Sequence, residues 1–403
     1  MLTGKKITVG ITGGIAAYKT ADLVSSLVKA GANVRVAMTS AAQKFITPLT
    51  LETLSGNPVH TDLFPNGFAG GVLHIDLAQN TDLLIIVPAT ANIIGKAANG
   101  IADDLVSTLL MAATCPVLFC PAMNVAMYNN PILQLNIGKL KEYGCHFVEP
   151  SIGPLACGTT GKGRLAELAE IVYNIEQMLT PQDLAGLRVL VTAGPTREPL
   201  DPVRYLTNRS SGKMGYALAK GAALRGAQVT LVSGPTNLNA PNAIDKIRVE
   251  TAVEMRDAVL KHSDHSDLII KAAAVADYGP MEISDHKIKK QADNMSIPLQ
   301  KNPDILGELG TRKKDQQVLV GFAAETHNLE RYAQSKLEKK NLDLLIANDV
   351  TLPGAGFDCN TNIVRIFWAD GTIEPLSKMA KEQVAQEILD RAIKVLRARR
   401  GEN

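Results

Sequence analysis

The chain has 403 residues, of which 46% are hydrophobic and 20% are charged, and this composition excludes a disordered, collagen-like or coiled-coil rod protein. Its 42 Lys and Arg residues stand against 40 Asp and Glu, so the net charge of +2 gives no indication of nucleic-acid binding. A chain of this length is expected to form two or three domains, each able to bury a core.

Cysteine usage and the apolar runs narrow the class further. No C-x-x-C pair is present, so neither a disulfide framework nor a zinc site is predicted. The cysteines are Cys115, Cys120, Cys145, Cys157 and Cys359. The first residues, MLTGKKITVG, lack the apolar stretch of a signal peptide, and runs such as residues 83–87 are too short to cross a bilayer. We therefore expect a cytoplasmic protein.

The chain begins with a strand, a glycine-rich turn, a helix and a second strand. Residues 5–12 (KKITVGIT) are β-branched and apolar, residues 15–31 have helical periodicity, and residues 33–38 (NVRVAM) form the next strand. The same order returns in the second half, where residues 187–195 predict a strand and residues 211–226 a helix. These patterns predict an α/β protein with two tandem doubly wound, Rossmann-like domains.

Two further segments define the organisation. The sequence MLTPQDLAG (178–186) follows an amphipathic helix that ends near Met178, so we expect domains at 1–180 and 187–403 joined by a linker at 179–186. Residues 279–302 are polar and lysine-rich between two apolar strands, which predicts a long loop. Loops of that length inside a compact domain are usually functional or mobile.

Candidate functional residues of the first half follow strands or glycines. Gly10, Gly13 and Gly14 would let backbone N–H groups approach a phosphate, although close strand–helix packing explains them equally well and G-x-G-x-x-G is absent. Asn124, in PAMN, follows an apolar strand, and its amide could hold a carboxylate or cap a turn. His74, at the start of an alternating segment, is either functional or structural.

A glycine-rich segment surrounds one cysteine. GPLACGTTGKGRLAE (153–167) cannot pack as a regular helix or strand and is interpreted as a flap, which would expose Cys157 to solvent and substrate. Lys162 and Arg164 lie nearby. Cys115, Cys120 and Cys145 are in or beside apolar strand-like segments, so they are expected in the core.

The second half contains serines and lysines that suit an anion. Ser210 and Ser211 are good N-caps for the helix at 211–226, where exposed N–H groups could hold a phosphate, although no Walker A loop is present. The run KIKK contains Lys287, Lys289 and Lys290. Lys336 and Lys340 are spaced i, i+4 and share a helix face, which also suits a solvated helix. Asp277 ends a predicted core strand, where it could contact a metal ion or a ribose.

Residues 5–178 resemble the homo-oligomeric flavin-containing cysteine decarboxylases. The matching motifs are GITGGIAAYK, the His in LHIDLA, PATANIIGKAANGIADDL, PAMNVAMY and GPLACGTTGKGR. The resemblance implies a flavodoxin-like domain that binds FMN, with His74 as base in the oxidative half-reaction, Asn124 as ligand of the substrate carboxylate and Cys157 as proton donor in the reductive half-reaction. The implied FMN-lining residues are Gly10, Thr12, Gly13, Ser40, Thr90 and Asn92. Tyr128 stands where the family motif has tryptophan, which predicts altered packing and retained chemistry.

The chemistry of the implied reaction, decarboxylation of a cysteine carboxylate, explains why it needs a flavin. A cysteine carboxylate has no electron sink, so direct loss of carbon dioxide would leave an unstabilised carbanion. Oxidation of the thiol to a thioaldehyde creates the sink, and a flavin can accept the hydride. The decarboxylated enethiolate then needs a hydride and a proton.

Residues 187–395 resemble the phosphopantothenate–cysteine ligase domain. The motifs are TAGPTREPLDPVRYLTNRSSGKMG, AAVADY, KIKK, KNPDI, VGFAAET and NLDLLIANDV. The resemblance implies that CTP activates the phosphopantothenate carboxylate as an acyl-cytidylate and that the amine of cysteine displaces CMP. It assigns Asn208 to the acyl intermediate and Lys287 to phosphate charge and the second step, with Mg²⁺ bridging the CTP phosphates. The implied CTP contacts are Ala273, Asp277, Lys287, Pro303, Asp304, Phe322, Lys336 and Lys340.

Together the two halves resemble the bifunctional decarboxylase–ligases of coenzyme A biosynthesis, because the product of the second half is the substrate of the first. The resemblance further implies a homo-oligomer with trimeric contacts between flavin domains and dimeric contacts between ligase domains. Three alternatives are a flavin prenyltransferase-like enzyme, a tandem dinucleotide oxidoreductase and a non-enzymatic regulatory flavoprotein. The flap around Cys157 argues against the prenyltransferase, and the missing G-x-G-x-x-G argues against the oxidoreductase. The joint presence of His74, Asn124 and Cys157 argues against a purely regulatory flavoprotein.

Overall fold

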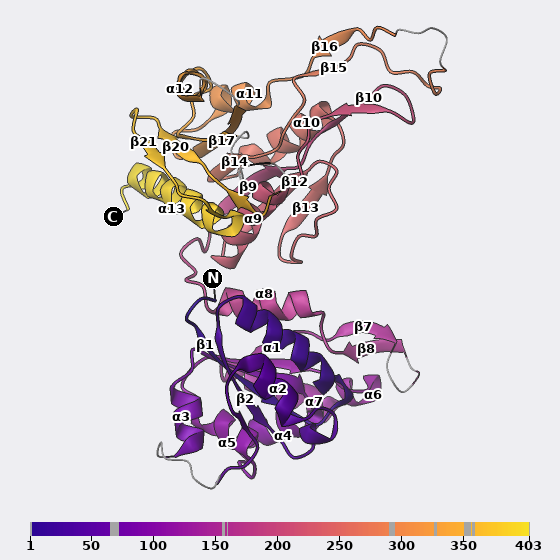
Figure 1. Cartoon of the computed structure of the whole chain (residues 1–403), viewed down its shortest axis with the longest axis vertical. Coiled ribbons are helices and arrows are strands. Elements are labelled where there is room, and N and C mark those ends of the chain that lie inside the picture. The colour runs from indigo at the N-terminus through magenta and orange to yellow at the C-terminus, as the bar shows by residue number, and fades with distance from the viewer. Residues whose placement is uncertain are drawn as a thin grey trace. The chain divides into compact units, whose positions relative to one another are not determined.

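The computed structural model describes residues 2–64, 72–154, 158, 160–289, 295–325, 329–349, 356 and 359–402. The chain splits into two compact units, Met1–Pro181 and Gln182–Asn403, which are called the first and second unit below (Figure 1). Among the described residues, no helix has both the length and the apolar character that crossing a membrane requires.

A parallel six-stranded sheet forms the centre of the first unit. Its order is β3-β2-β1-β4-β5-β6, so successive strands are added outward on one side of β1 and then on the other. The strands are β1 (Lys6–Ile11), β2 (Asn33–Met38), β3 (Val59–His60), β4 (Leu83–Ala89), β5 (Val117–Pro121) and β6 (His146–Phe147). This is the doubly wound order, and it places the switch point between β1 and β4.

Helices cover both faces of this sheet, so the central strand β4 is buried along its whole length. One core contains α1 and α8, and the other contains α3, α4, α5 and α7. The helices are η1 (Ile15–Lys19), α1 (Thr20–Lys29), η2 (Ala42–Lys44), α2 (Pro48–Ser55), α3 (Leu73–Gln79), α4 (Ala91–Ala98), α5 (Leu105–Ala112), α6 (Val125–Tyr128), α7 (Pro131–Glu142) and α8 (Leu168–Met178).

The second unit repeats the doubly wound order in a larger sheet, β13-β12-β9-β14-β17-β18-β20-β21. Its first six strands are parallel, and β20 and β21 continue the sheet in antiparallel pairing. The strands are β9 (Arg188–Ala193), β12 (Gln228–Ser233), β13 (Asp245–Arg248), β14 (Leu268–Lys271), β17 (Val318–Glu325), β18 (Leu344–Asp349), β20 (Arg365–Trp368) and β21 (Ile373–Pro375). The switch point lies between β9 and β14.

Among the described residues, two helices cover one face of this second sheet and three cover the other. On one side α9 packs against α13, and on the other lie α10, α11 and α12. The helices are α9 (Lys213–Leu224), α10 (Ala252–Ser263), α11 (Ile305–Arg312), α12 (Leu329–Lys339) and α13 (Lys381–Arg400). A short pair, β19 (Thr361–Asn362) and β22 (Met379–Ala380), precedes α13.

Several local expectations were wrong. The segment around His74, expected to alternate like a strand, is helix α3, because Leu73, Leu77 and Ala78 turn toward one core at helical spacing. The helix predicted at 15–31 begins as a 3₁₀ turn before α1. Neither Ser210 nor Ser211 caps α9, since Gly212, in the left-handed conformation, is its N-cap.

Strands also occur where only loops were expected. The segment after β9 forms the pair β10 (Arg197–Pro199) and β11 (Tyr205–Thr207), and the ends of the 279–302 segment pair as β15 (Tyr278–Pro280) and β16 (Leu299–Lys301). The glycine-rich flap is a hairpin of β7 (Ser151–Pro154) and β8 (Thr160–Arg164). Of the segment 179–186, the part from Gln182 onward packs into the second unit, where Leu184 is fully buried.

Candidate functional sites

The predicted flavin-lining residues gather at one edge of the first sheet. They lie at or after the carboxyl ends of β1, β2 and β4, where open α/β sheets bind ligands. Thr12 links two of these ends: its Oγ1 donates to the Pro88 carbonyl at 2.6 Å and accepts from the Thr90 N–H at 3.2 Å. Ser40 and Asn92 are exposed at the same edge, so their polar groups are available to a ligand.

Close packing explains two of the glycines at this edge. A Cβ on Gly10 would approach Ile86 Cδ1 to 2.7 Å, and a Cβ on Gly13 would approach Ala41 Cβ to 2.4 Å. At Gly13 the obstructing atoms belong to the Ala41 Cβ and backbone, so packing requires glycine there; at Gly10 packing only favours glycine, because the Ile86 Cδ1 atom ends a side chain that can shift. The two interpretations offered for these glycines are therefore compatible, and the glycines do not by themselves indicate a phosphate.

The flap hairpin is attached to the PAMN loop. The Met123 N–H donates to the Gly163 carbonyl at 2.9 Å, and a Cβ on Gly163 would stand 2.3 Å from the Met123 carbonyl oxygen. A Cβ on Gly161 would stand 2.8 Å from Val125 Cγ2. The glycines thus let β8 lie directly on the loop that carries Asn124. Cys157 lies outside the described residues.

Asn124 caps the turn that begins α6. Its Oδ1 accepts from the Ala126 N–H at 2.8 Å as the N-cap of α6. This bond uses the acceptor side of the amide, and the NH₂ group is the part that suits a carboxylate. The structure therefore shows the turn-capping role, and the carboxylate role stays a prediction.

His74 lies on a different element from Asn124. It is half-buried on α3, and its Nδ1 is enclosed without a hydrogen-bond partner among the described residues. Among the residues that the structure describes, no hydrogen bond or ion pair joins His74 to Asn124. The structure of a single chain thus places Asn124 beside the base of the Cys157 hairpin and leaves His74 on a separate helix.

Tyr128, at the position of the family tryptophan, anchors the flap by its hydroxyl. The ring is buried, its O–H donates to Glu149 Oε2 at 2.8 Å, and Lys162 of β8 pairs with the same oxygen at 2.8 Å. The Lys162 ammonium also lies 5.5 Å from the centre of the Tyr128 ring. Burial alone would raise the pKa of Glu149, but the hydrogen bonds from Lys162 and Tyr128 outweigh it and lower this pKa to about 2.

This cluster predicts a pH-dependent contribution to the stability of the first unit. Because the folded pKa of Glu149 lies below the unfolded value of about 4.3, its contribution is present above that pH and is lost as the pH falls toward 2. Glu149→Gln is expected to lower stability at pH 7 by up to about 1 kcal/mol, since half of this side chain is exposed. The difference from wild type should shrink below pH 4.

Calorimetric melting of the full chain between pH 2 and 7 measures this difference. Glu167→Gln is the matched control, because Glu167 pairs with Arg164 at 3.2 Å on a more exposed surface. A difference between wild type and Glu149→Gln that stays constant over the whole range would contradict the assignment.

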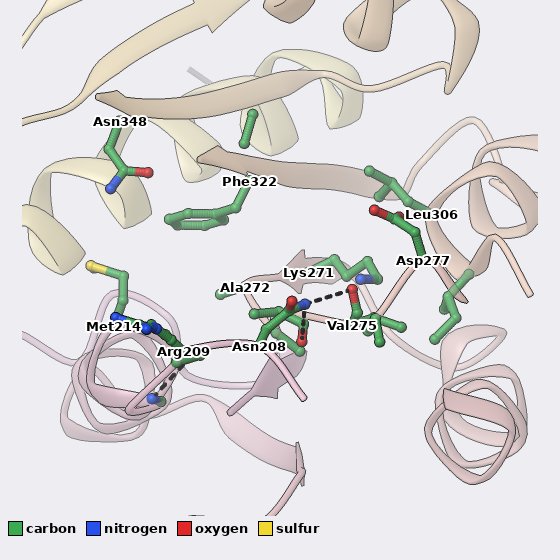
Figure 2. A pocket seen from close by; sticks show the side chains of 18 of the residues that line it. Asn208, Arg209, Met214, Lys271, Ala272, Val275, Asp277, Leu306, Phe322 and Asn348 are labelled. Atoms are coloured by element: carbon green, nitrogen blue, oxygen red, sulfur yellow. Dashed lines mark hydrogen bonds between the residues drawn. The ribbon is translucent and has the colours of Figure 1, made fainter. Parts of the chain in front are cut away.

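The second unit contains a pocket of about 830 Å³ at the carboxyl ends of β14 and β17 and the start of α9 (Figure 2). The predicted ligands of CTP and of the acyl intermediate line it, with one exception. Those present are Asn208, Ala273, Asp277, Pro303, Asp304, Phe322, Lys336 and Lys340. The exception is Lys287, which is exposed beyond β15 and is not among the lining residues that the structure describes. Lys290 lies outside the described residues.

Two asparagines hold the turn after β14. Asn208 Nδ2 donates to the carbonyls of Ala274 and Val275 at 3.2 and 3.1 Å (Figure 2). Asn302 Nδ2 donates to the Ala276 carbonyl at 2.8 Å. Both donors of the Asn208 amide are used in this way, so its side-chain oxygen is the remaining polar group of a side chain that lines the pocket.

The lysines of the pocket differ in their partners. Lys340 pairs with Asp304, whose Oδ1 accepts from the Gly307 N–H at 2.9 Å as the N-cap of α11. Burial alone would raise the pKa of Asp304, but the bonds from Lys340 and Gly307 lower it below its ordinary value. Lys336 Nζ donates to the Phe322 carbonyl at 3.0 Å. Lys271 also lines the pocket.

Lys271 was missed by the sequence reasoning. The only local signal was a lysine that ends an otherwise apolar strand, in SDLIIKAAAVAD.

Comparison with known proteins matches each unit separately and the whole chain together. Residues 1–180 match the family described as Flavoprotein, and residues 184–396 match the DNA/pantothenate metabolism flavoprotein C-terminal domain. The coenzyme A biosynthesis bifunctional protein CoaBC of Bacillus subtilis (strain 168) is 52% identical over 393 residues, covering 96% of this chain and 97% of that protein. The CoaBC protein of Escherichia coli (strain K12) is 47% identical over 397 residues, with 97% of each chain covered.

Among solved structures, the crystal structure of the C-terminal domain of a CoaBC protein is 45% identical. It covers 54% of this chain and 99% of that domain, with a TM-score of 0.47.

Proposed function

Because this chain belongs to the family of coenzyme A biosynthesis bifunctional proteins CoaBC, we propose specific roles for its residues in two consecutive reactions. The second unit ligates 4′-phosphopantothenate to cysteine, and the first unit decarboxylates the resulting phosphopantothenoylcysteine to 4′-phosphopantetheine. The observation that carries the proposed roles is the convergence of Asn208, Asp277, Phe322 and two lysines from distant segments on one pocket.

In the ligase reaction, CTP occupies this pocket with its phosphates near Lys336 and Lys340 and its remaining part near Phe322 and Asp277. A carboxylate oxygen of phosphopantothenate attacks the α-phosphorus and pyrophosphate leaves. The amine of cysteine then attacks the acyl carbon and CMP leaves. The lysines offset negative charge that develops on the phosphates in the first step. Asn208, at the turn after β14, lies where the acyl group would be held.

Mg²⁺ is proposed to enter with CTP. Among the described residues no three His, Cys, Asp or Glu side chains gather into a cation site. This agrees with a magnesium ion held mainly by phosphate oxygens and water, which needs few protein ligands.

The proposed contact between Lys287 and CTP requires a further condition. It is exposed on the segment between β15 and β16, away from the residues that line the pocket. For Lys287 to contact CTP, this segment has to move toward the pocket or be contributed by a second copy of the chain. Exposed apolar side chains support a dimer of second units. Tyr278 and Ile283 lie on β15 and the segment after it, and Val203 lies in the loop between β10, which contacts β15, and β11.

In the decarboxylase reaction, FMN is proposed to bind at the switch point between β1 and β4. The hydroxyls and amides of Thr12, Ser40, Thr90 and Asn92 are the kind of polar groups that hold a phosphate and a ribityl chain, so the edge fits this cofactor. FMN supplies the two-electron chemistry when bound. Asn124 holds the substrate carboxylate and Cys157 delivers a proton.

The position of His74 favours a site completed by a neighbouring copy. His74 lies on α3, and a base has to reach its proton within hydrogen-bond distance. A trimer of first units, in which α3 of one copy faces the Asn124 loop of another, would meet this requirement.

One reaction mixture tests the whole assignment. Purified chain is incubated with 4′-phosphopantothenate, cysteine, CTP and Mg²⁺, without added flavin, and the products are identified by mass spectrometry. The expected products are 4′-phosphopantetheine, CMP and pyrophosphate. Accumulation of phosphopantothenoylcysteine would contradict the decarboxylase assignment alone, and untouched substrates would contradict the ligase assignment, on which the supply of substrate to the first unit depends.

A further inference from the structure

Lys271 is a half-buried lysine of the ligase pocket whose ammonium has no protein partner among the described residues. Lys340 is paired with Asp304, and Lys336 donates to the Phe322 carbonyl. Lys271 lines the same pocket, and no hydrogen bond or ion pair joins its ammonium to any residue that the structure describes. Burying part of an ammonium group without a protein partner costs free energy. An anion bound in the pocket would offset this cost, which suits a site for a polyanion.

The strand dictates where this side chain points. Lys271 is the last residue of β14 and pairs with Thr192 on one side and Gly321 on the other, at the switch point of the sheet. Side chains alternate along a strand, so Lys271 emerges on the same face as Ile269. Ile269 belongs to the core beneath α10, α11 and α12, and therefore Lys271 extends under the helices that carry Asp304 and Lys336.

Charged groups of both signs surround the Lys271 ammonium. Burial lowers the pKa of Lys271 most, Lys336 lowers it further, and Asp304 and Asp277 oppose them, which leaves the pKa at about 8. Lys340 also lines the pocket, and its ammonium pairs with Asp304. At pH 8 the amine is thus about half protonated, and a polyanion placed beside it will draw a proton onto it.

We propose that Lys271 is a further nucleotide-binding residue of the ligase pocket, and that it takes up a proton from solvent when the triphosphate of CTP enters. The inference rests on the proposed function of this pocket as the CTP site. Binding couples to protonation because the charged amine interacts with phosphate and the neutral amine does not. CTP affinity therefore falls as the pH rises above 8.

Titration calorimetry of the full chain with CTP and Mg²⁺ tests this, without phosphopantothenate so that no reaction follows. Buffers of different ionisation enthalpy at pH 8 report the protons bound per CTP. At this pH the phosphates of CTP are already ionised. Wild type should take up a fraction of a proton per CTP at this pH, and clearly less at pH 6.5.

Three variants separate the outcomes. Lys271→Met should abolish the uptake and weaken CTP binding about tenfold. Lys271→Arg, which stays charged, should abolish the uptake and keep the affinity within a few-fold, and it carries the test if the methionine variant does not fold. Lys339→Met, an exposed lysine on α12 outside the pocket, should behave as wild type.

Equal proton uptake in wild type and both Lys271 variants would overturn the inference while leaving CTP binding intact. Failure of wild type to bind CTP would overturn the proposed nucleotide site itself, and the inference with it.

Discussion

Gly163→Ala is expected to lower the rate of decarboxylation about 100-fold while ligation continues at its normal rate. A methyl group at this position would stand 2.3 Å from the Met123 carbonyl oxygen, so β8 has to move away from the PAMN loop. That movement shifts the β7–β8 hairpin away from Asn124 by up to about 1 Å. A displacement of this size in a catalytic site lowers the rate by about two orders of magnitude. Phosphopantothenoylcysteine supplied directly, with carbon dioxide release as the readout, measures the effect.

Gly153→Ala is the matched control in the same hairpin. Its added methyl group would lie 3.6 Å from Arg164 Cδ, an ordinary contact, so decarboxylation should stay within a few-fold of wild type. Ligation, measured as pyrophosphate release in the same preparations, reports on the second unit. A Gly163→Ala enzyme with full decarboxylase activity would show that the close approach of β8 to the PAMN loop is not needed for catalysis.

Asn208→Asp is expected to reduce ligation about 100-fold and leave decarboxylation unchanged. The replacement has nearly the same shape, but a carboxylate cannot donate to the carbonyls of Ala274 and Val275, which lie 3.2 and 3.1 Å from Nδ2. Oxygen atoms would then face each other, and the turn has to shift. Because Ala273 and Asp277 belong to the same turn, their positions in the pocket would change with it.

Asn99→Asp controls for the chemistry of this replacement. Asn99 Nδ2 also donates to a backbone carbonyl, that of Gly95 at 2.8 Å, but on an exposed helix end of the first unit. Pre-steady-state measurement of acyl-cytidylate formation and of its reaction with cysteine shows which step slows in Asn208→Asp. Unchanged rates of both steps would exclude a role for Asn208 in positioning the turn.

The fold was largely predictable because its strands are buried on both faces. Residues 81–92 and 266–277 both predict an apolar strand followed by a polar turn. The first segment forms β4 and the start of α4, and the second forms β14 and the turn that lines the pocket. In a parallel sheet covered by helices, such runs have few alternatives. The misassigned segment near His74 was short, and seven residues do not distinguish a helix from a strand by periodicity alone.

The candidate sites were predictable residue by residue but not as assemblies. Motifs placed Asn124 and Asp277 after strand ends, because ligand-binding loops follow the carboxyl ends of parallel strands. That Lys336 and Lys340 reach the same pocket as Asn208 could not be read from spacing, since the chain between them builds four strands of the sheet. Lys287, predicted beside them, lies elsewhere on the described chain.

By itself, the sequence determined the two doubly wound units and the motifs, because hydrophobic periodicity and short motifs are local properties of the chain; the reaction pair followed from the resemblance that those motifs carry. The tertiary structure alone decided that Gly161 and Gly163 serve the contact between β8 and the PAMN loop, that the Tyr128 hydroxyl anchors Glu149, and that Lys271 points under α11 and α12. Each of these depends on which surfaces meet after folding. Distances across such contacts are set by packing of the whole unit, and no local pattern records them.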